Sequence, residues 1–142
     1  HELLASCGAV SLHAPLTPTT RGLMGAAELA RMPRGAYLVN TARGELIEPR
    51  ALAEALESGH IAGAALDTLA PEPPPDNHSL LNLSPAARER LLLTPHIAGT
   101  TQGAFHRMLT GGLNNLRTVA AGGPPRHVVN GIFKARTAAV TE

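Results

Sequence analysis

Short apolar runs alternate with helix-like segments along the first hundred residues of the chain. Four runs have the length of β-strands, and they cover residues 9–12, 36–40, 61–66 and 91–93. Each run gives way to polar or Gly/Pro-rich sequence at its C-terminal end. This pattern predicts four short strands, each followed by a turn or loop.

Helix signals follow the runs. Pro33 and Gly35 stop a helical segment at 25–32, while Pro49 suits a first helical position and Gly59 a stop. A short helix is predicted from Ser84 through residue 90, and a long one from Thr100 or Thr101 to about residue 121. Strands that alternate with helices across short turns favour βαβ units. The fold class is therefore predicted to be α/β, with a parallel sheet and flanking helices.

Two segments bear on domain organisation. Residues 1–6 read like the tail of a helix without a start signal, so we expect the chain to begin in the middle of a fold. Residues 67–85 form a long loop rich in proline, asparagine and serine, with a turn expected at 77–82. The predicted division is a sheet unit at 1–99, a long helix with a return segment at 100–130, and a tail at 131–142.

Composition excludes several classes of function. The 142 residues are 44% hydrophobic, 16% charged and 2% aromatic, and the formal net charge is +1. We therefore expect a real core, no nucleic-acid partner and no membrane partner. Cys7 is the single cysteine, so an intramolecular disulfide is excluded, and no histidine–carboxylate spacing favours a metal site. No apolar stretch approaches the roughly 20 residues that span a bilayer. A cytoplasmic location is the expectation.

Three polar residues follow successive runs and carry the candidate chemistry. They are Arg43, Glu72 and His96. Because the carboxyl ends of parallel strands share one edge, residues far apart in sequence can converge there. An arginine can bind a carboxylate, a histidine can move a proton, and a glutamate can orient that histidine. The trio predicts redox or proton-transfer chemistry on a small organic acid.

Other polar residues have ordinary interpretations. Ser11 could suggest a hydrolase nucleophile, as could Thr17 and Thr20, but no G-x-S-x-G elbow accompanies them. Asp67 could be a cap or part of the site. His13 is expected in a structural or supporting role, and Cys7 as a small buried residue. The polar surroundings of four other histidines predict solvated side chains: His60, His78, His106 and His127.

Four segments in order resemble the D-isomer-specific 2-hydroxyacid dehydrogenases. They are Ser11-Leu12-His13-Ala14-Pro15-Leu16-Thr17, Val39-Asn40-Thr41-Ala42-Arg43-Gly44, Ala62-Gly63-Ala64-Ala65-Leu66-Asp67 with Glu72-Pro73, and Thr94-Pro95-His96-Ile97-Ala98-Gly99. Residues 128–130 are similar to the usual ending of that family. The likeness covers roughly residues 3 to 130, and its strength lies in the order and spacing of the four segments.

The resemblance implies a fold, a cofactor and residue roles. It implies the C-terminal part of a Rossmann-type NAD-binding domain within residues 1–99, with NAD as cofactor and NADP left open. A small 2-hydroxy or 2-oxo acid is the implied substrate, and a homodimer the implied assembly. The catalytic roles fall on Arg43, Glu72 and His96. The implied cofactor-binding residues are Ala14, Thr41, Ala42, Arg43, Asp67, His96, Ile97, Ala98 and Gly99.

The sequence also departs from the family pattern. It has no G-x-G-x-x-G loop and no ribose-reading acidic residue after one, and we expect both upstream of His1. Gly8 stands where an aspartate is often found, and Thr68-Leu69 replaces a common Val-Phe pair. One alternative is a truncated, catalytically inactive module that dimerises or binds a partner. Phosphite dehydrogenase shares the trio, whereas formate dehydrogenases pair the histidine with glutamine, so Glu72 counts against them.

Overall fold

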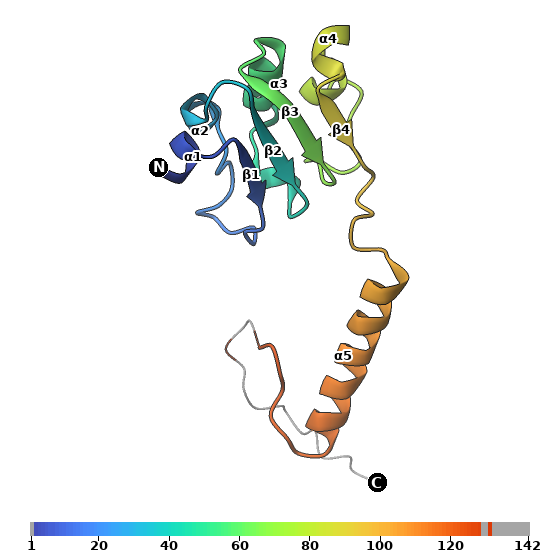
Figure 1. Ribbon diagram of the computed structural model, residues 1–142. Helices are drawn as coiled ribbons and strands as arrows, with labels where there is room; N and C mark the ends of the chain where they lie inside the picture. Colours follow the sequence, from blue (N-terminus) through green and yellow to red (C-terminus); the bar gives the residue numbers. More distant parts are fainter. Residues whose placement is uncertain (1, 129–130, 132–142) are drawn as a thin grey trace. The chain divides into compact units, whose positions relative to one another are not determined.

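The computed structural model describes residues 2–128 and residue 131, and it divides the chain into two compact units, residues 1–98 and 99–142. The first unit is built on a four-stranded parallel sheet in the order β1-β2-β3-β4 (Figure 1). The strands are β1 Ala9–Leu12, β2 Ala36–Asn40, β3 Ile61–Leu66 and β4 Leu91–Leu93. All four have the bounds predicted from the apolar runs, and the predicted α/β class is confirmed.

Helix α1 (Glu2–Ser6) precedes the first strand of this unit, and the other five helices, three α and two 3₁₀, connect its strands. The five are α2 Ala26–Arg31, η1 Gly44–Leu46, α3 Pro49–Glu57, η2 Ser79–Leu81 and α4 Pro85–Arg88. The caps follow the sequence signals: the Ser84 side chain accepts a hydrogen bond from the Ala87 amide, and Pro49 takes the first position of α3. The helix predicted at 25–32 is one residue too long at each end, the helix predicted to reach residue 90 ends at Arg88, and η1 was not predicted.

The helices lie on one face of the sheet because of its strand order. Every strand pairs with the next one in the chain, so each right-handed crossover steps in the same direction and places its helix on the same side. Helix α3 contacts both α2 and α4. Burial along β2 alternates accordingly: Leu38 is fully buried on the helix side, whereas Tyr37 on the other side is 55% exposed.

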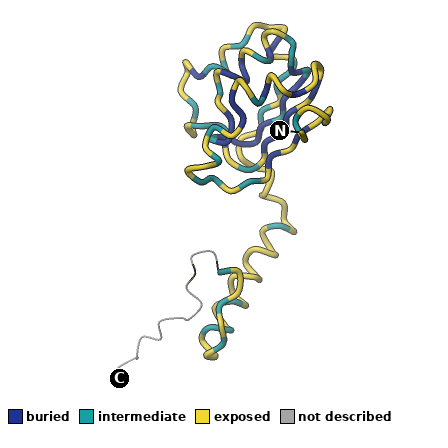
Figure 2. The backbone as a smooth tube through the Cα atoms, turned by 90° about the vertical axis from the view of Figure 1, so that its left-hand side faces the viewer, coloured by how far each residue is buried: buried dark blue, intermediate teal, exposed yellow. Residues whose placement is uncertain are grey.

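The core lies between the helices and the covered face of the sheet. Figure 2 shows the buried residues gathered in the interior of this unit. Leu38 from β2 and Ile61 from β3 meet Leu52 and Leu56 from α3, and none of the four side chains is exposed. Leu52 and Leu56 are four residues apart in α3, so their side chains share one face of the helix. Burial of each such side chain stabilises the fold by about 1.5–3 kcal/mol.

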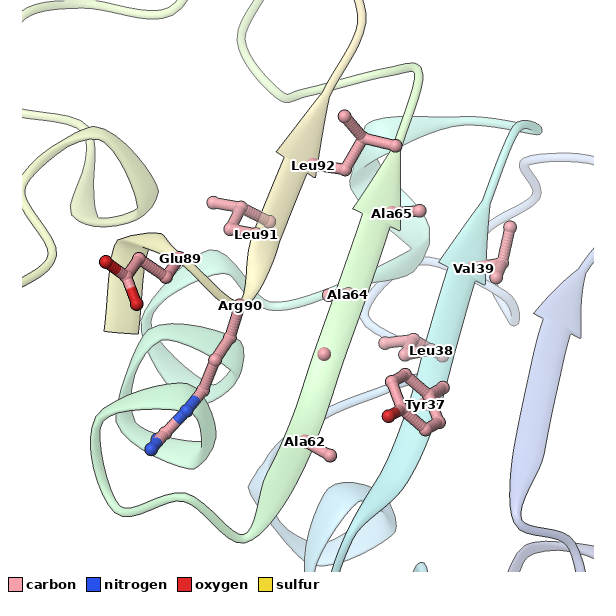
Figure 3. A pocket seen from close by; sticks show the side chains of 11 residues that line it. Tyr37, Leu38, Val39, Ala62, Ala64, Ala65, Glu89, Arg90, Leu91 and Leu92 are labelled. Atoms are coloured by element: carbon pink, nitrogen blue, oxygen red, sulfur yellow. The ribbon is translucent and has the colours of Figure 1, made fainter. Parts of the chain in front are cut away.

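The opposite face of the sheet carries an open hollow of about 500 Å³ (Figure 3). Val39, Ala65 and Leu92 form one row across it, because these three residues pair in register on β2, β3 and β4. Gly63 leaves space in this hollow for the ring of Tyr37, because a Cβ at Gly63 would lie 3.1 Å from that ring. This face is apolar and, within the first unit, lies on the side opposite the helices.

The second unit is dominated by α5, which spans Gln102–Ala120. The Thr101 side chain caps it by accepting a hydrogen bond from the Ala104 amide at 3.2 Å. Residues after the helix fold back on it, because Asn115 Oδ1 accepts a hydrogen bond from the Arg126 amide at 2.8 Å. No helix of the described residues is both long and apolar enough to cross a membrane. The predicted ending motif at 128–130 and the tail at 131–142 lie mostly outside the described residues.

The helix α5 is apolar along much of its surface. Its large side chains are between 49% and 68% exposed. They are Phe105, Met108, Leu109, Leu113 and Leu116.

The buried hydroxyl of Thr68 yields a stability prediction. Thr68 is 3% exposed, and its Oγ1 has no hydrogen-bond partner within the described part of the chain. A desolvated hydroxyl without a partner is costly, and valine has nearly the same shape. We therefore expect Thr68→Val to raise the free energy of unfolding by about 1 kcal/mol in urea titrations. Thr110→Val on the exposed surface of α5 is the control and should change it little. A destabilised Thr68→Val would contradict this account.

Candidate functional site

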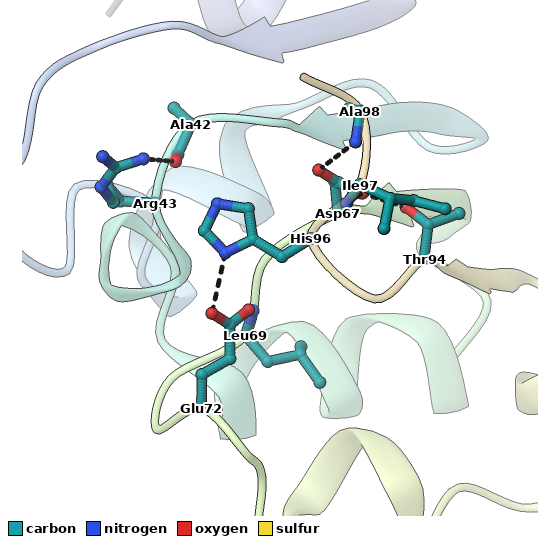
Figure 4. A network of polar contacts seen from close by, with 9 residues as sticks. All are labelled: Ala42, Arg43, Asp67, Leu69, Glu72, Thr94, His96, Ile97 and Ala98. Atoms are coloured by element: carbon teal, nitrogen blue, oxygen red, sulfur yellow. Dashed lines mark hydrogen bonds and ion pairs between the residues drawn. The ribbon is translucent and has the colours of Figure 1, made fainter. Parts of the chain in front are cut away.

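The carboxyl edge of the sheet gathers the polar residues that follow β2, β3 and β4 (Figure 4). Arg43 comes three residues after β2, Asp67 directly follows β3, and His96 comes three residues after β4. Glu72 lies in the long loop after β3. This arrangement follows from the parallel sheet, in which all four strands run toward the same edge.

Glu72 and His96 are joined by a direct hydrogen bond between their side chains. His96 Nδ1 lies 2.9 Å from Glu72 Oε2, and the side chains are 50% and 40% exposed. Glu72 Oε1 accepts a second hydrogen bond from the Leu69 amide at 3.2 Å. The bond from His96 and the Leu69 amide together hold the pKa of Glu72 below its ordinary value. Since Nδ1 is engaged by Glu72, the second ring nitrogen, Nε2, points away from Glu72 (Figure 4).

Asp67 fixes the loop that carries His96. Its carboxylate accepts hydrogen bonds from Thr94 Oγ1 at 2.5 Å, from the Ile97 amide at 3.0 Å and from the Ala98 amide at 2.9 Å. The Thr94 bond is the largest cause of a lowered Asp67 pKa, and the two amides lower it further. Asp67 itself is only 4% exposed. These contacts are those of a cap for residues 94–98, and the role of Asp67 in the site stays a prediction.

The backbone of His96 adopts a left-handed conformation, with a φ of 55°. This region is uncommon for residues other than glycine and costs on the order of 1–3 kcal/mol. It persists because Asp67 binds the chain on both sides of the histidine, at Thr94 and at Ile97. The His96 amide also donates to the Thr94 carbonyl oxygen at 3.0 Å. The imidazole is thus held by a turn that the buried carboxylate stabilises.

Asn40 holds the turn that carries Arg43. It is fully buried at the end of β2; its Nδ2 donates to the Arg43 carbonyl oxygen at 2.8 Å, and its Oδ1 accepts from the Ala42 amide at 3.0 Å. The exposed Arg43 side chain folds back so that Nη1 donates to the Ala42 carbonyl oxygen at 2.7 Å. Asn40 was not among the predicted site residues. The signal that could have identified it is an amide side chain at the end of an apolar strand, directly before a turn.

A crevice of about 480 Å³ lies between the segments that follow β1 and β2. Its walls come from the segments after both strands: His13, Ala14, Pro15, Leu16, Ala42 and Arg43. Ala14 and Ala42 have only methyl side chains, so the crevice stays open to a flat ligand. His13 is tied to Ser11 by a 2.8 Å hydrogen bond between Nε2 and Oγ.

The remaining predicted cofactor residues occupy three places. Thr41 is exposed beside the crevice, and Asp67 lies with Ile97 and Ala98 in the network around His96. Gly99 begins the second unit, whose position relative to the first is not described.

Two expectations about other side chains were wrong. His78 is 6% exposed rather than solvated: its Nδ1 accepts from the Leu80 amide, and its Nε2 donates to the Ala70 carbonyl oxygen, both at 3.3 Å. It is buried because it caps η2 and ties that helix to the Glu72 loop, a long-range contact invisible in local composition. His60 is half-buried, with Nε2 3.1 Å from the Leu29 carbonyl oxygen. Cys7 is half-buried and packs against the core, as expected of a small apolar residue.

The lowered pKa of Asp67 makes the stability of this edge depend on pH. The contribution is present above the unfolded-state pKa of about 3.9, and it is lost as pH falls through the still lower folded-state pKa. At neutral pH, Asp67→Asn should destabilise the chain by about 2 kcal/mol, since an amide keeps a single acceptor oxygen. The gap in melting temperature between the two proteins should shrink as pH is lowered toward about 3. Asp76→Asn at an exposed site is the control, and a pH-independent gap would refute the assignment.

Comparison with known proteins identifies a family. The family model described as "D-isomer specific 2-hydroxyacid dehydrogenase, NAD binding domain" matches residues 1–98. A glycerate dehydrogenase of Methylorubrum extorquens is 38% identical over 122 residues, which are 86% of this chain and 38% of that relative.

Two solved structures resemble the chain closely. One is a D-isomer-specific 2-hydroxyacid dehydrogenase from Lactobacillus delbrueckii ssp. bulgaricus in its NAD-complexed form, with a TM-score of 0.73 and 38% identity over 90% of this chain and 42% of that chain. The other is a family member from Xanthobacter autotrophicus Py2 in complex with NADPH and MES, with a TM-score of 0.75 and 39% identity over 88% of this chain and 49% of that chain. The chain spans less than half the length of each of these three proteins. It belongs to the D-isomer-specific 2-hydroxyacid dehydrogenase family and matches the NAD-binding domain of that family.

Proposed function

We propose that this chain supplies the catalytic edge of a nicotinamide-dependent oxidoreductase that interconverts D-2-hydroxy acids and 2-oxo acids. The observation that carries the proposal is the 2.9 Å pair between His96 and Glu72 at the same sheet edge as Arg43. A carboxylate-oriented imidazole beside a guanidinium suits the reduction of a carbonyl next to a carboxylate. The proposed catalytic residues are those of the resemblance: Arg43, Glu72 and His96.

Arg43 is proposed to bind the substrate carboxylate. Its guanidinium is exposed and always charged, and its planar fork can donate two parallel hydrogen bonds to a carboxylate. The same charge would polarise the neighbouring carbonyl at C2. Asn40 keeps the Arg43 backbone in place during this task through its 2.8 Å bond to the carbonyl oxygen.

His96 is proposed to be the general acid and base. With Nδ1 bonded to Glu72, Nε2 is the atom that donates a proton to the substrate oxygen in reduction and removes it in oxidation. The Glu72 carboxylate fixes the orientation of the imidazole through its bond to Nδ1. Such a positioned acid typically contributes about 10²–10⁴ to the rate.

The crevice between the segments that follow β1 and β2 is the proposed position for the cofactor, which supplies the hydride when bound. Its walls bring Ala14, Ala42 and Arg43 to a flat ligand, and Thr41, Asp67 and residues 96–99 complete the proposed set. Similar structures hold NAD and NADPH, and we favour NAD because the matched family domain is described as NAD-binding.

A homodimer and a cytoplasmic location are further parts of the proposal, as is the division at 1–99, 100–130 and 131–142. The apolar open face of the sheet, with Tyr37 55% and Leu92 62% exposed, favours an assembly partner.

The same face favours the second candidate, an inactive dimerising or partner-binding module. Calorimetric titration of the 142-residue chain with NADH separates the two: binding in the micromolar range favours the enzyme, and no binding favours the module.

Replacing the proposed acid tests the function. We expect His96→Ala to lower kcat by about 10²–10⁴ in NADH-dependent reduction of 2-oxo acids, because no group remains to protonate the substrate oxygen. The assay uses the polypeptide encoded by the full open reading frame around this sequence. Cofactor affinity should change little. His106→Ala on the exposed surface of α5 is the control, and near-normal turnover by His96→Ala would disprove the role.

Replacing Arg43, the proposed carboxylate-binding residue, tests substrate recognition separately. Arg43→Lys keeps the charge but loses the planar fork, so we expect kcat/KM for the 2-oxo acid to fall on the order of 10- to 100-fold. The affinity for NADH should fall less than kcat/KM for the 2-oxo acid, because lysine keeps the positive charge beside the crevice. Arg50→Lys, at an exposed position on α3, is the matched control. An unchanged kcat/KM would show that Arg43 does not bind the carboxylate.

A further inference from the structure

Gly44 makes the closest backbone approach of any glycine in the first unit. It is buried at the start of η1, directly after Arg43. A Cβ built on Gly44 would lie 2.7 Å from the Ala70 amide nitrogen and closer still to the carbonyl group of Leu69. Real Cβ atoms essentially never approach another atom this closely. Its backbone does not adopt the left-handed conformation, so space rather than a dihedral angle requires glycine here.

The backbone that Gly44 touches leads directly to the catalytic pair. The Leu69 amide donates a hydrogen bond to Glu72 Oε1 at 3.2 Å, and Glu72 Oε2 lies 2.9 Å from His96 Nδ1. The position of Leu69 therefore helps to set where the Glu72 carboxylate meets the imidazole. Each of these contacts, from Gly44 to Leu69, from Leu69 to Glu72 and from Glu72 to His96, joins the two groups directly.

Neither side of the contact can move easily. On the Gly44 side, Asn40 clamps the Arg43 carbonyl oxygen at 2.8 Å, and the Ile47 amide donates to the Gly44 carbonyl oxygen at 3.1 Å. On the other side, buried His78 donates to the Ala70 carbonyl oxygen at 3.3 Å. An added methyl group at Gly44 must therefore displace one of two restrained segments.

We propose that Gly44 is a positioning residue that sets the separation between the Arg43 turn and the Glu72 loop, and through Leu69 the contact between Glu72 and His96. The inference deepens the proposed function, on which the catalytic meaning of the pair rests. The contact itself is a property of the folded chain and needs no cofactor or substrate. Gly44 thus helps to position both Arg43, the proposed carboxylate-binding residue, and the pair of Glu72 and His96.

Gly44→Ala is the direct test in the 142-residue chain. Displacement of Leu69 should weaken both hydrogen bonds to Glu72, so the pKa of Glu72 should rise toward its ordinary value. Carbon-detected NMR titration of the Glu72 carboxyl group measures this change. Gly8→Ala is the matched control, because a Cβ there meets nothing within 4 Å, and it should leave the Glu72 titration unchanged. A folded Gly44→Ala chain with an unchanged Glu72 titration would overturn the proposal.

Glu72→Asp decides the matter if Gly44→Ala does not fold. If the Glu72 loop is held in place, the aspartate carboxylate lies one methylene too far from His96 to keep the hydrogen bond. The pKa of that aspartate should then be the ordinary value for an aspartate. A loop free to shift would restore the bond and lower that pKa, which would refute the proposal.

Activity separates this inference from the proposed function. In the reductase assay, Gly44→Ala should lower kcat by roughly 100-fold, the cost of a misplacement near 1 Å, while NADH affinity changes less. If the NMR result holds but the unaltered protein reduces no 2-oxo acid, the positioning role stands and the proposed function fails.

Discussion

The buried carboxylate of Asp67 joins the end of β3 to the loop after β4, and the geometry of the candidate site depends on it. Three hydrogen bonds from Thr94, Ile97 and Ala98 converge on one side chain that is 4% exposed. They stabilise a left-handed backbone at His96 that few residues adopt unaided. Without them, the imidazole would not be held opposite Glu72.

A second constraint comes from the direction of the sheet. Four parallel strands in sequential order bring every strand end to one edge and send every crossover helix to one face. The edge gathers functional side chains, while the helices bury the core on the covered side. The same topology leaves Tyr37 and Leu92 exposed on the other side, so the apolar open face is a direct consequence of the strand order.

Several contacts support the site without contributing a reacting group. Asn40 clamps the Arg43 turn, His78 anchors the Glu72 loop at Ala70, and Gly44 lets the two segments approach. All three residues are buried and contact main-chain atoms. Such contacts hold the backbone of a loop in place, as the hydrogen bonds of a sheet do for a strand. The exposed side chains of Arg43, Glu72 and His96 are thus presented by buried, hydrogen-bonded residues.

Local pattern in the sequence was sufficient for the regular elements and for the convergence of their ends. The four strand bounds follow from apolar runs, and Thr101, Ser84 and Pro49 marked helix starts, because strand and helix formation depends on neighbours in the chain. The α/β class and the family resemblance rested on the same local information. The sequence likewise placed an arginine, a glutamate and a histidine after successive strands.

The tertiary structure decided what those residues touch. The Asp67 network, the burial of His78 and the close approach of Gly44 to Leu69 all join segments 8 to 31 residues apart. Composition could not reveal them, and it predicted a solvated His78. The physical reason is that burial and hydrogen bonding depend on which distant segments fold against each other. The sequence by itself determined the elements and the candidate chemistry, whereas only the packing of the loops determined how Glu72 meets His96.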